Sequence, residues 1–311
     1  MLLNRGQYQQ HIESIRNLFE RSFGKTIPKD YLLWRYYNNP LDELFVAVEF
    51  DGDSIISHYA VSPALVFMDG VWKKAAMSMT TMTDPDYAGK GLFPKLADEI
   101  YESLKEKNYA FVFGFPNTQS HRGFIQKLDW IDIYEIPTFR LEIDNNTILQ
   151  NNIPTDKLST DNSFNLDYST SQIIKQKNYI LKNNDYLRWR YRDNPVNDYK
   201  CLVITSTGKV TSFCVMKNYE NAIDIVDFQA FDMEEGYRLL QEVLTIAKSD
   251  NITAINIWAP RHCFIHQLCE KIGFVNKEPV TYFCCRTFDP SIGNCSIYSN
   301  WYIQMGDSDV Y

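Results

Sequence analysis

The chain has 311 residues, 45% of them hydrophobic and 23% charged, an ordinary composition for a globular protein of about two domains. Its formal net charge of -8 at pH 7 speaks against a nucleic-acid-binding surface, and no apolar run is long enough for a membrane span. The beginning of the sequence lacks the apolar block of a signal peptide, so we expect a cytoplasmic protein.

The first half of the chain predicts helices followed by a sheet. Helical spacing of apolar residues predicts helices over residues 8–23 and 31–37. The turn dipeptides Asp51-Gly52 and Asp69-Gly70 separate strand patterns over residues 44–50, 55–68 and 71–83. The later elements are a helix from Leu92, a strand over 109–115, a short helix over 120–130 and a strand over 130–142 that completes the first sheet.

A glycine loop lies between the strand that ends at Thr83 and the helix that begins near Leu92. It reads Asp-Pro-Asp-Tyr-Ala-Gly-Lys-Gly from residue 84 to residue 91. Glycines leave backbone N–H groups accessible at the start of a helix, where the positive end of the helix dipole favours an anion. The junction therefore predicts a site for a pyrophosphate, although an ordinary turn before a surface helix would also read this way.

The wider order of strand, glycine loop, helix, strand, Asn and short helix resembles the GNAT superfamily of acetyl-CoA-dependent N-acetyltransferases. The match to the loop of that family, which binds the CoA pyrophosphate, lies at Pro85, Tyr87, Gly89, Lys90 and Gly91. Two positions depart from the family: Ala88 stands where Arg or Gln is usual, and Phe93 stands where Gly or Ala is usual. We expect the Phe93 ring to lie beneath the helix as part of the core.

The resemblance implies direct transfer of an acetyl group from acetyl-CoA to an amine, without a covalent enzyme intermediate. A backbone N–H near Met82 or Thr83 would polarise the thioester carbonyl, and Asn117 would lie near the cofactor. The expected cofactor-binding residues are Met82, Thr83, Tyr87, Ala88, Gly89, Lys90, Gly91, Leu92, Phe93, Asn117 and Phe124.

The proton-transfer groups are less well defined. The Tyr that protonates the leaving thiolate in many relatives is replaced by Ile125, and a thiol, with a pKa of about 8.5, leaves readily without it. Position alone makes Asp84, Tyr134 and Glu135 the candidate catalytic residues, with His58 and His121 as further candidate bases. The expected acceptor-binding residues are Trp34, Tyr36 and His58, for which a structural role is the alternative.

An internal repeat indicates a second copy of the same unit. Residues 30–40 return as residues 185–195 with eight of eleven positions identical. The glycine loop aligns with residues 231–237, where Asp232, Glu234 and Glu235 would repel a pyrophosphate. The sequence therefore predicts an α/β fold with mixed sheets, built from two GNAT-like units in tandem, of which only the first binds acetyl-CoA.

The expected domains are residues 1–143 with the acetyl-CoA site, a polar linker over 144–170, a degenerate GNAT-like domain over 171–290 and a tail over 291–311. The second unit is expected to begin with a helix over 171–183 and to end with a strand over 281–287. Its other elements are strands over 199–206, 210–218, 222–230 and 254–259 and helices over 234–250 and 262–272. The tail is expected to add an edge strand or to return to a pocket.

All seven cysteines lie in the second half and lack the paired spacing of a zinc site, so we expect reduced core thiols and no metal. The leading hypothesis is an N-acetyltransferase for a small-molecule amine, with an amino sugar of surface polysaccharide synthesis as the favoured acceptor. The Trp-Arg-Tyr-x-x-Asn-Pro and Gly-Phe-Pro-Asn segments resemble acetyltransferases of that setting. The alternatives are a Fem-like aminoacyl transferase and a catalytically inactive CoA-binding or partner protein. A monomer or homodimer is expected, with no nucleic-acid partner.

Overall fold

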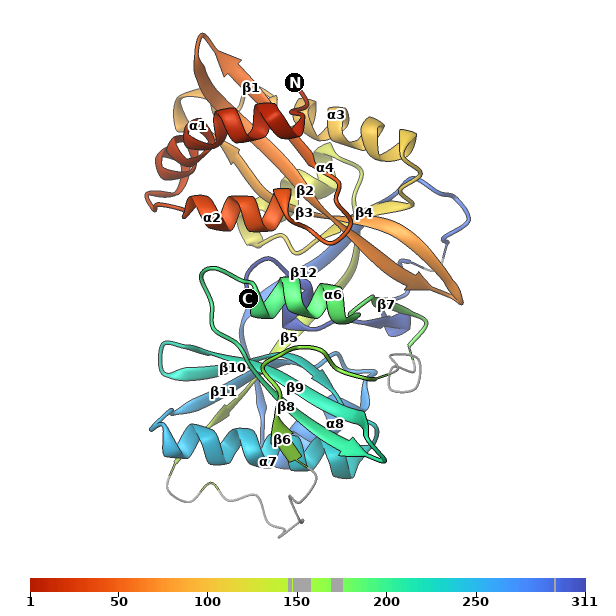
Figure 1. Cartoon of the computed structure of the whole chain (residues 1–311). Coiled ribbons are helices and arrows are strands. Elements are labelled where there is room, and N and C mark those ends of the chain that lie inside the picture. The colour runs from red at the N-terminus through yellow and green to blue at the C-terminus, as the bar shows by residue number, and fades with distance from the viewer. Residues whose placement is uncertain (145–146, 148–157, 169–175, 294) are drawn as a thin grey trace. The chain divides into compact units, whose positions relative to one another are not determined.

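The computed structural model describes residues 1–144, 147, 158–168, 176–293 and 295–311 (Figure 1). The chain forms two compact units, and neither is one continuous segment. The first unit contains Met1–Tyr134, Asn194–Val196 and Tyr282–Ser296, and the second contains Glu135–Asp193, Asn197–Thr281 and Ile297–Tyr311. The division expected near residue 144 stays a prediction about independently folding domains.

The first unit is built on a mixed sheet. Its strands are β1 (Phe45–Asp51), β2 (Ser54–Met68), β3 (Val71–Thr83) and β4 (Phe111–Gly114). The first three pair antiparallel through the two predicted hairpins, and β4 pairs parallel to β3. The helices of this unit are α1 (Arg5–Phe23), α2 (Lys29–Leu32), α3 (Leu92–Glu106) and α4 (Thr118–Lys127).

Helix α3 packs on one face of this sheet through its apolar stripe. Leu96, Ile100 and Leu104 recur at helical spacing and are completely buried, together with Tyr59 and Val61 of β2. Residues alternate between the two faces of a strand, so His58, next to Tyr59, points to the opposite face. The sheet of this unit is therefore covered on both sides, and burying each such aliphatic side chain contributes roughly 1.5 to 3 kcal/mol.

The second unit also combines a mixed sheet with helices. Its strands pair in the order β5, β11, β10, β9, β8, β6, and all neighbours are antiparallel except β10 and β11. Their bounds are β5 Ile131–Glu142, β6 Leu158–Thr160, β8 Lys200–Ser206, β9 Lys209–Tyr219, β10 Ala222–Gln229 and β11 Ala254–Trp258. The helices are α6 (Asn184–Leu187), α7 (Met233–Ser249) and α8 (Phe264–Ile272). The mixed α/β fold predicted from the sequence is confirmed.

Two strands differ from the prediction in the sheet that they join. The strand expected to complete the first sheet is β5, and its residues 138–142 pair antiparallel with β11 in the second unit. The strand expected to finish the second unit belongs to β12 (Val275–Thr287), and its residues 284–287 pair antiparallel with β4 in the first unit. The alternation of apolar and polar residues along a strand predicts which of its faces is buried. It does not predict which strand lies beside it, because that depends on contacts between residues far apart in the sequence.

Two other predictions also need correction. The helix expected over residues 171–183 is wrong where the structure describes it, because Asn178–Ile180 is the strand β7; residues 171–175 lie outside the described part. Within the predicted linker, Leu158–Thr160 is the strand β6, which pairs with β8. Short polar segments pair with a sheet edge when neighbouring backbone is available, and their composition does not reveal it.

The C-terminal tail packs into the second unit. Trp301–Tyr302 forms the strand β13, which pairs parallel with β7, so the predicted edge strand is present but short. Lys182 forms ion pairs with Asp227 and with Asp307 of the tail, and all three side chains are at most 2% exposed. Across the described residues, no helix combines the length and the apolar character needed to cross a membrane.

Candidate active site

Strands β3 and β4 part at one end of the first unit. Their parallel register runs from Ala75 opposite Phe111 to Met77 opposite Phe113 and then stops, while β3 continues to Thr83. Where parallel neighbours separate, backbone groups that would have paired across the sheet become available to a ligand. This opening is the end of the sheet from which the glycine loop leaves.

A β-bulge lies in the part of β3 beyond this separation. The register between β2 and β3 shifts between His58 and Ala60, and Thr80 has a positive φ of 49°. A β-branched residue in this conformation carries strain, and bulges and strain of this kind often re-aim backbone groups at functional sites. Met82 and Thr83, the residues expected beside the thioester, follow the bulge directly.

Three buried side chains gather against the bulge on the face opposite α3. The His58 ring places Nδ1 2.9 Å from the Thr80 carbonyl oxygen, and the Tyr36 ring lies edge-on at 6.2 Å between centroids. Arg35 Nε lies 3.1 Å from Met79 Sδ. All three are at most 2% exposed, so two of the predicted acceptor residues, Tyr36 and His58, shape this site from beneath its surface.

Burial sets the protonation of this group. It lowers the pKa of His58 to about 4, an effect that the hydrogen bond with the Thr80 carbonyl opposes. The imidazole is therefore neutral at pH 7, with Nδ1–H donating to Thr80 and Nε2 as an acceptor. Burial also raises the pKa of Tyr36, which keeps its hydroxyl protonated. Trp34, the third predicted acceptor residue, is 6% exposed and packs against Tyr31.

The glycine loop has the backbone geometry expected of an anion site. Gly89 and Gly91 have φ of 77° and 75°, and a Cβ atom on either would meet no atom within 4 Å. Gly91 caps α3, and within the described residues the N–H groups of residues 89–93 donate no hydrogen bond. Accessible N–H groups at the start of a 15-residue helix suit a pyrophosphate. Lys90 Nζ lies 4.1 Å from the centre of the Tyr87 ring.

The loop is held to the rest of the unit by two acidic residues. Asp84 accepts a hydrogen bond from Arg21 Nε of α1 at 2.6 Å and caps the short turn Pro85–Tyr87. Tyr87 donates to Asp51 of β1. The hydrogen bond from Arg21 lowers the pKa of Asp84, which makes this carboxylate a weaker base and favours a positioning role for it.

Helix α4 contributes the remaining cofactor candidates. Asn117 is its N-cap, and its side chain accepts hydrogen bonds from the N–H groups of Gln119 and Ser120 at 3.0 Å. The Phe124 ring meets the Phe93 ring at 5.1 Å, so Phe93 packs against the core as the sequence predicted. Ile125, at the position of the usual general acid, also packs against this core.

The two other catalytic candidates lie at the boundary of the units. Tyr134 is the last residue of the first segment of unit one, and Glu135 is an exposed residue of unit two. The catalytic roles predicted for both residues stay predictions. Tyr134 is half-buried on β5.

A cluster that the sequence did not predict lies between α4, β5 and β12 in the first unit. His121 Nε2 and Cys284 Sγ lie 2.6 Å and 3.0 Å from the same carboxylate oxygen of Asp132. The ligand atoms of the three lie within 4.8 Å of one another, so they could hold a metal ion. Their separation in the sequence left no spacing motif by which to find them. The sequence had predicted no metal.

Comparison with known proteins gives two kinds of similarity. Residues 5–131 match the sequence family described as acetyltransferase (GNAT) domain, which covers the glycine loop and most of the first unit. No curated protein matches the sequence of this chain. Many solved structures share its fold.

Three of these structures cover nearly the whole chain. A conserved protein of unknown function from Enterococcus faecalis V583, described as a probable N-acyltransferase, has a TM-score of 0.70 at 11% identity and covers 93% of this chain and 71% of its own. A GCN5-related N-acetyltransferase from Anabaena variabilis ATCC 29413 has a TM-score of 0.62 at 12% identity, over 94% of this chain and 72% of its own. A GCN5-related N-acetyltransferase from Kribbella flavida has a TM-score of 0.65 at 10% identity, over 96% of this chain and 74% of its own. The chain therefore has the fold of GNAT-like N-acyltransferase structures, and its residues 5–131 match the acetyltransferase (GNAT) domain.

Proposed function

We propose that the first unit binds acetyl-CoA and transfers its acetyl group directly to the amine of a small molecule. The observation that carries this proposal is the glycine loop, with its accessible N–H groups at the start of α3, next to the bulge in β3. The pyrophosphate would lie on the N–H groups of residues 89–93, and the thioester would lie beside Met82 and Thr83. Both features belong to one end of one sheet.

In this proposal, catalysis comes mainly from holding the two reactants in line. The acceptor amine attacks the carbonyl carbon, and a backbone N–H following the bulge stabilises the oxyanion, a contribution of roughly 3 kcal/mol for one well-placed donor. The C–S bond then breaks, and CoA leaves as a thiolate that takes up a proton. Because Ile125 replaces the usual acid, that proton comes from solvent or from the protonated nitrogen of the tetrahedral intermediate, which must lose it to become the amide.

We infer that the second unit is a degenerate copy that does not bind acetyl-CoA. The repeated sequence forms the same local structure in both units, a short helix followed by the π-helical turns Leu33–Tyr37 and Arg188–Arg192. The start of α7, which aligns with the glycine loop, already carries carboxylates of its own. Asp232 caps the helix, and Glu235 accepts hydrogen bonds from Thr211 and Ser212. Asp232 thus occupies the N–H group of Glu235, and the carboxylates at this helix start would repel a pyrophosphate.

The favoured acceptor is an amine of low pKa, such as that of an amino sugar of surface polysaccharide synthesis. A lysine-like amine would need about 4 to 5 kcal/mol for deprotonation at neutral pH, whereas an α-amine or amino-sugar amine needs about 1. The neutral His58 and the paired Asp84 offer little base strength, and this supports the same preference. A monomer or homodimer in the cytoplasm remains the expectation from the sequence.

Two alternatives make different predictions. A Fem-like aminoacyl transferase would pair two such units but would not depend on the glycine loop. A catalytically inactive CoA-binding protein would bind acetyl-CoA without releasing CoA in the presence of any amine. This alternative is suggested by the three departures from the family pattern, Ala88, Phe93 and Ile125. The intact backbone of the loop favours a CoA ligand over a tRNA-borne donor.

Calorimetric titration with acetyl-CoA tests the proposal. We expect one site per chain in the wild type and loss of binding in Gly91→Glu, which places a side chain and a negative charge in the loop. Gly70→Glu is the matched control, because Gly70 also has a positive φ, 93°, and open surroundings but lies in the β2–β3 hairpin. Binding that survives Gly91→Glu would reject the loop assignment. Thiol release in a panel of amines then separates an enzyme from a binding protein.

A further inference from the structure

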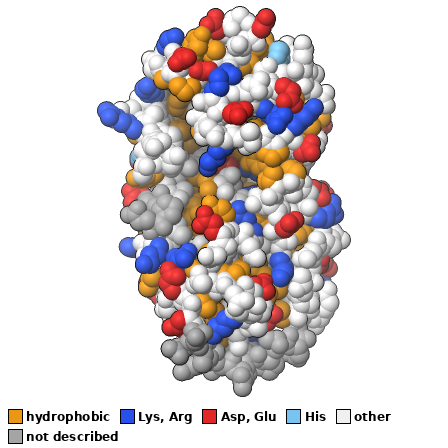
Figure 2. Space-filling model, turned by 90° about the vertical axis from the view of Figure 1, so that its left-hand side faces the viewer, with side chains coloured by type: hydrophobic (Ala, Val, Ile, Leu, Met, Phe, Trp, Pro, Cys, Tyr) orange, Lys and Arg blue, Asp and Glu red, His pale blue; other side chains and the backbone are white. Residues whose placement is uncertain are grey.

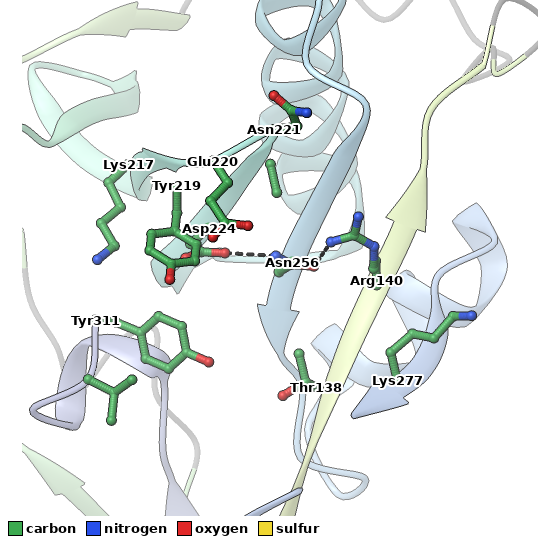
Figure 3. A pocket seen from close by; sticks show the side chains of 12 residues that line it. Thr138, Arg140, Lys217, Tyr219, Glu220, Asn221, Asp224, Asn256, Lys277 and Tyr311 are labelled. Carbon is green, nitrogen blue, oxygen red and sulfur yellow. Dashed lines mark hydrogen bonds between the residues drawn. The ribbon is translucent and has the colours of Figure 1, made fainter. Parts of the chain in front are cut away.

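A cavity of about 410 Å³ opens in the second unit, apart from the proposed acetyl-CoA site. Figure 3 shows side chains from β5, β9, β10 and β11 pointing into it from one face of the sheet, with Tyr311 of the tail on the other side. The volume lies in the range of small-molecule sites and suits a monosaccharide-sized ligand. All of its lining residues belong to the second unit, so the argument needs only that unit.

Lys217 is the most unusual residue of this cavity. Its side chain is 7% exposed, yet across the described residues it forms no ion pair. Its one hydrogen bond runs from Nζ to Asn197 Oδ1 at 3.3 Å, which leaves two ammonium protons for another partner. Burial lowers the pKa of Lys217, and the negative charge of Asp224, its cross-strand neighbour, opposes this shift only in part. A buried ammonium group facing a cavity is stabilised by an anionic ligand.

Asp224 supplies an oriented acceptor in the same cavity. It is 3% exposed, and its Oδ1 accepts a hydrogen bond from Asn256 Nδ2 at 2.8 Å. Asn256 Oδ1 accepts in turn from Arg140 Nη1 at 3.1 Å, as the dashed lines in Figure 3 show. This chain fixes the Asp224 carboxylate while its second oxygen has no hydrogen bond within the described residues. Such an oxygen accepts from a hydroxyl or an amine of a ligand.

Two tyrosines provide apolar surface and further hydroxyl groups. Lys217 Nζ lies 5.7 Å from the ring centre of Tyr219 and 5.9 Å from that of Tyr311. The Tyr311 ring is held edge-on against Trp258 at 5.4 Å. Aromatic rings of this kind offer a flat apolar face with a polar tip, which suits a ligand with both C–H and hydroxyl surface.

The ion pairs of the lining select among ligands. Arg140 Nε is already paired with Glu142 Oε1 at 2.7 Å, which leaves Lys217 and Lys277 against Asp224 and Glu220 in the lining. A neutral sugar would give the buried ammonium group of Lys217 no ion pair. The carboxylate of a polyhydroxylated acid supplies that ion pair, and its hydroxyl groups use the remaining hydrogen-bonding groups.

We propose that this cavity binds a hexose-sized sugar acid, with its carboxylate on Lys217 and its hydroxyl groups on Asp224 and Arg140. The second unit is then a ligand-binding module as well as a structural partner of the first. The inference stands apart from the acetyl-CoA proposal, because its residues and its ligand are different.

Calorimetric titration of the full chain with D-glucuronate tests the inference, with D-glucose as the neutral match. We expect glucuronate to bind at one site and glucose to bind at least about tenfold more weakly, because glucose gives the buried ammonium group of Lys217 no ion pair. The result would be overturned by no glucuronate binding at roughly 20 mM, far weaker than specific sites bind, or by glucose binding as tightly.

Two variants locate the site. Lys217→Met keeps the length of the side chain and removes a buried charge, and we expect glucuronate binding to fall by roughly tenfold or more. Asp224→Asn keeps the shape of the side chain and removes the anionic acceptor, and we expect glucuronate binding to fall in this variant too. The test therefore still works if one of the two variants fails to fold. Lys200→Met is the control, since Lys200 is an exposed lysine of β8 outside the cavity. Unchanged binding in both cavity variants would reject this location.

Discussion

His58 Nδ1 lies 2.9 Å from the carbonyl oxygen of Thr80, the residue whose positive φ marks the bulge in β3. The contact links the second strand of the first unit to the strained point of the third. A neutral imidazole donates this hydrogen bond without placing a buried charge against the backbone. The bulge and the protonation state of His58 therefore depend on each other, and pH can report on both.

The first prediction concerns the pH dependence of stability through His58. Burial lowers its folded-state pKa from 6.5 to about 4, so the unfolded chain binds this proton more readily. The contribution is fully present above pH 6.5 and is lost as pH falls toward 4. Between pH 7 and pH 5 the wild type should lose about 2 kcal/mol of unfolding free energy that His58→Gln does not lose. Urea denaturation at both pH values measures it.

The control for this experiment is His11→Gln, which removes a half-buried histidine of α1 in the same unit. We expect that variant to retain the loss of stability seen in the wild type. Equal losses in the wild type and in His58→Gln would mean that His58 is protonated in the folded protein.

A second prediction concerns the buried ion pairs of Lys182 in the second unit. Lys182→Met leaves Asp227 and Asp307 buried with no cation between them. Removing one partner of a buried ion pair costs about 3 to 5 kcal/mol, so the thermal midpoint should fall by many degrees. Adding Asp307→Asn to this variant should restore part of the loss. Lys200→Met, on the exposed face of β8, should leave the thermal midpoint unchanged. A similar midpoint for both lysine variants would show that the ion pairs of Lys182 do not stabilise the fold.

The third prediction separates positioning from base catalysis at Asp84. If Asp84 holds the loop through Arg21, then Asp84→Asn and Arg21→Gln should weaken acetyl-CoA binding alike, by roughly three- to tenfold, since each loses one charge-assisted hydrogen bond. If Asp84 is the base, Asp84→Asn should instead lower kcat by roughly a hundredfold or more with binding intact. Calorimetry with both variants, followed by turnover with a competent amine, distinguishes the two.

A fourth prediction concerns the thiols. All seven cysteines are buried and none forms a disulfide. Burial raises the pKa of Cys214 and of Cys269, which keeps them unreactive, whereas the hydrogen bond that Cys285 donates at 3.7 Å between sulfurs lowers the pKa of Cys295. Ellman's reagent should therefore find one slow thiol in the native protein, absent in Cys295→Ser, and all seven in denaturant. Rapid reaction of several thiols in the native protein would contradict the described burial.

The charged side chains on one face of the molecule are mixed in sign. Figure 2 shows Lys and Arg side chains scattered among Asp and Glu on that face. A nucleic-acid surface would gather positive charge into a continuous patch. The expectation of no nucleic-acid partner stays a prediction from the net charge of -8.

The parts of the fold that the sequence predicted are those set by local chemistry. The apolar spacing of Leu96, Ile100 and Leu104 requires an amphipathic helix, and Asp51-Gly52 requires a tight hairpin turn. The glycine loop was likewise visible, because positive φ at Gly89 and Gly91 is a local property.

What escaped prediction depends on contacts between distant residues. The bulge at Thr80 arises from the register between two strands, and the strand sequence is compatible with a regular pairing too. His121, Asp132 and Cys284 meet only because β12 joins the first unit. The cavity around Lys217 draws on five strands and the tail.

The pairing of β12 with β4 has a consequence for how the protein is made. Gly114 and its partner Cys284 are separated by more than half of the chain. During synthesis the β4 edge of the first unit must therefore wait, exposed, until nearly the whole chain has left the ribosome. An open strand edge is a point for mispairing and aggregation. The first unit is thus completed only by residues from the far end of the chain, and a gene fragment ending after α4 would encode a sheet with one side unfinished.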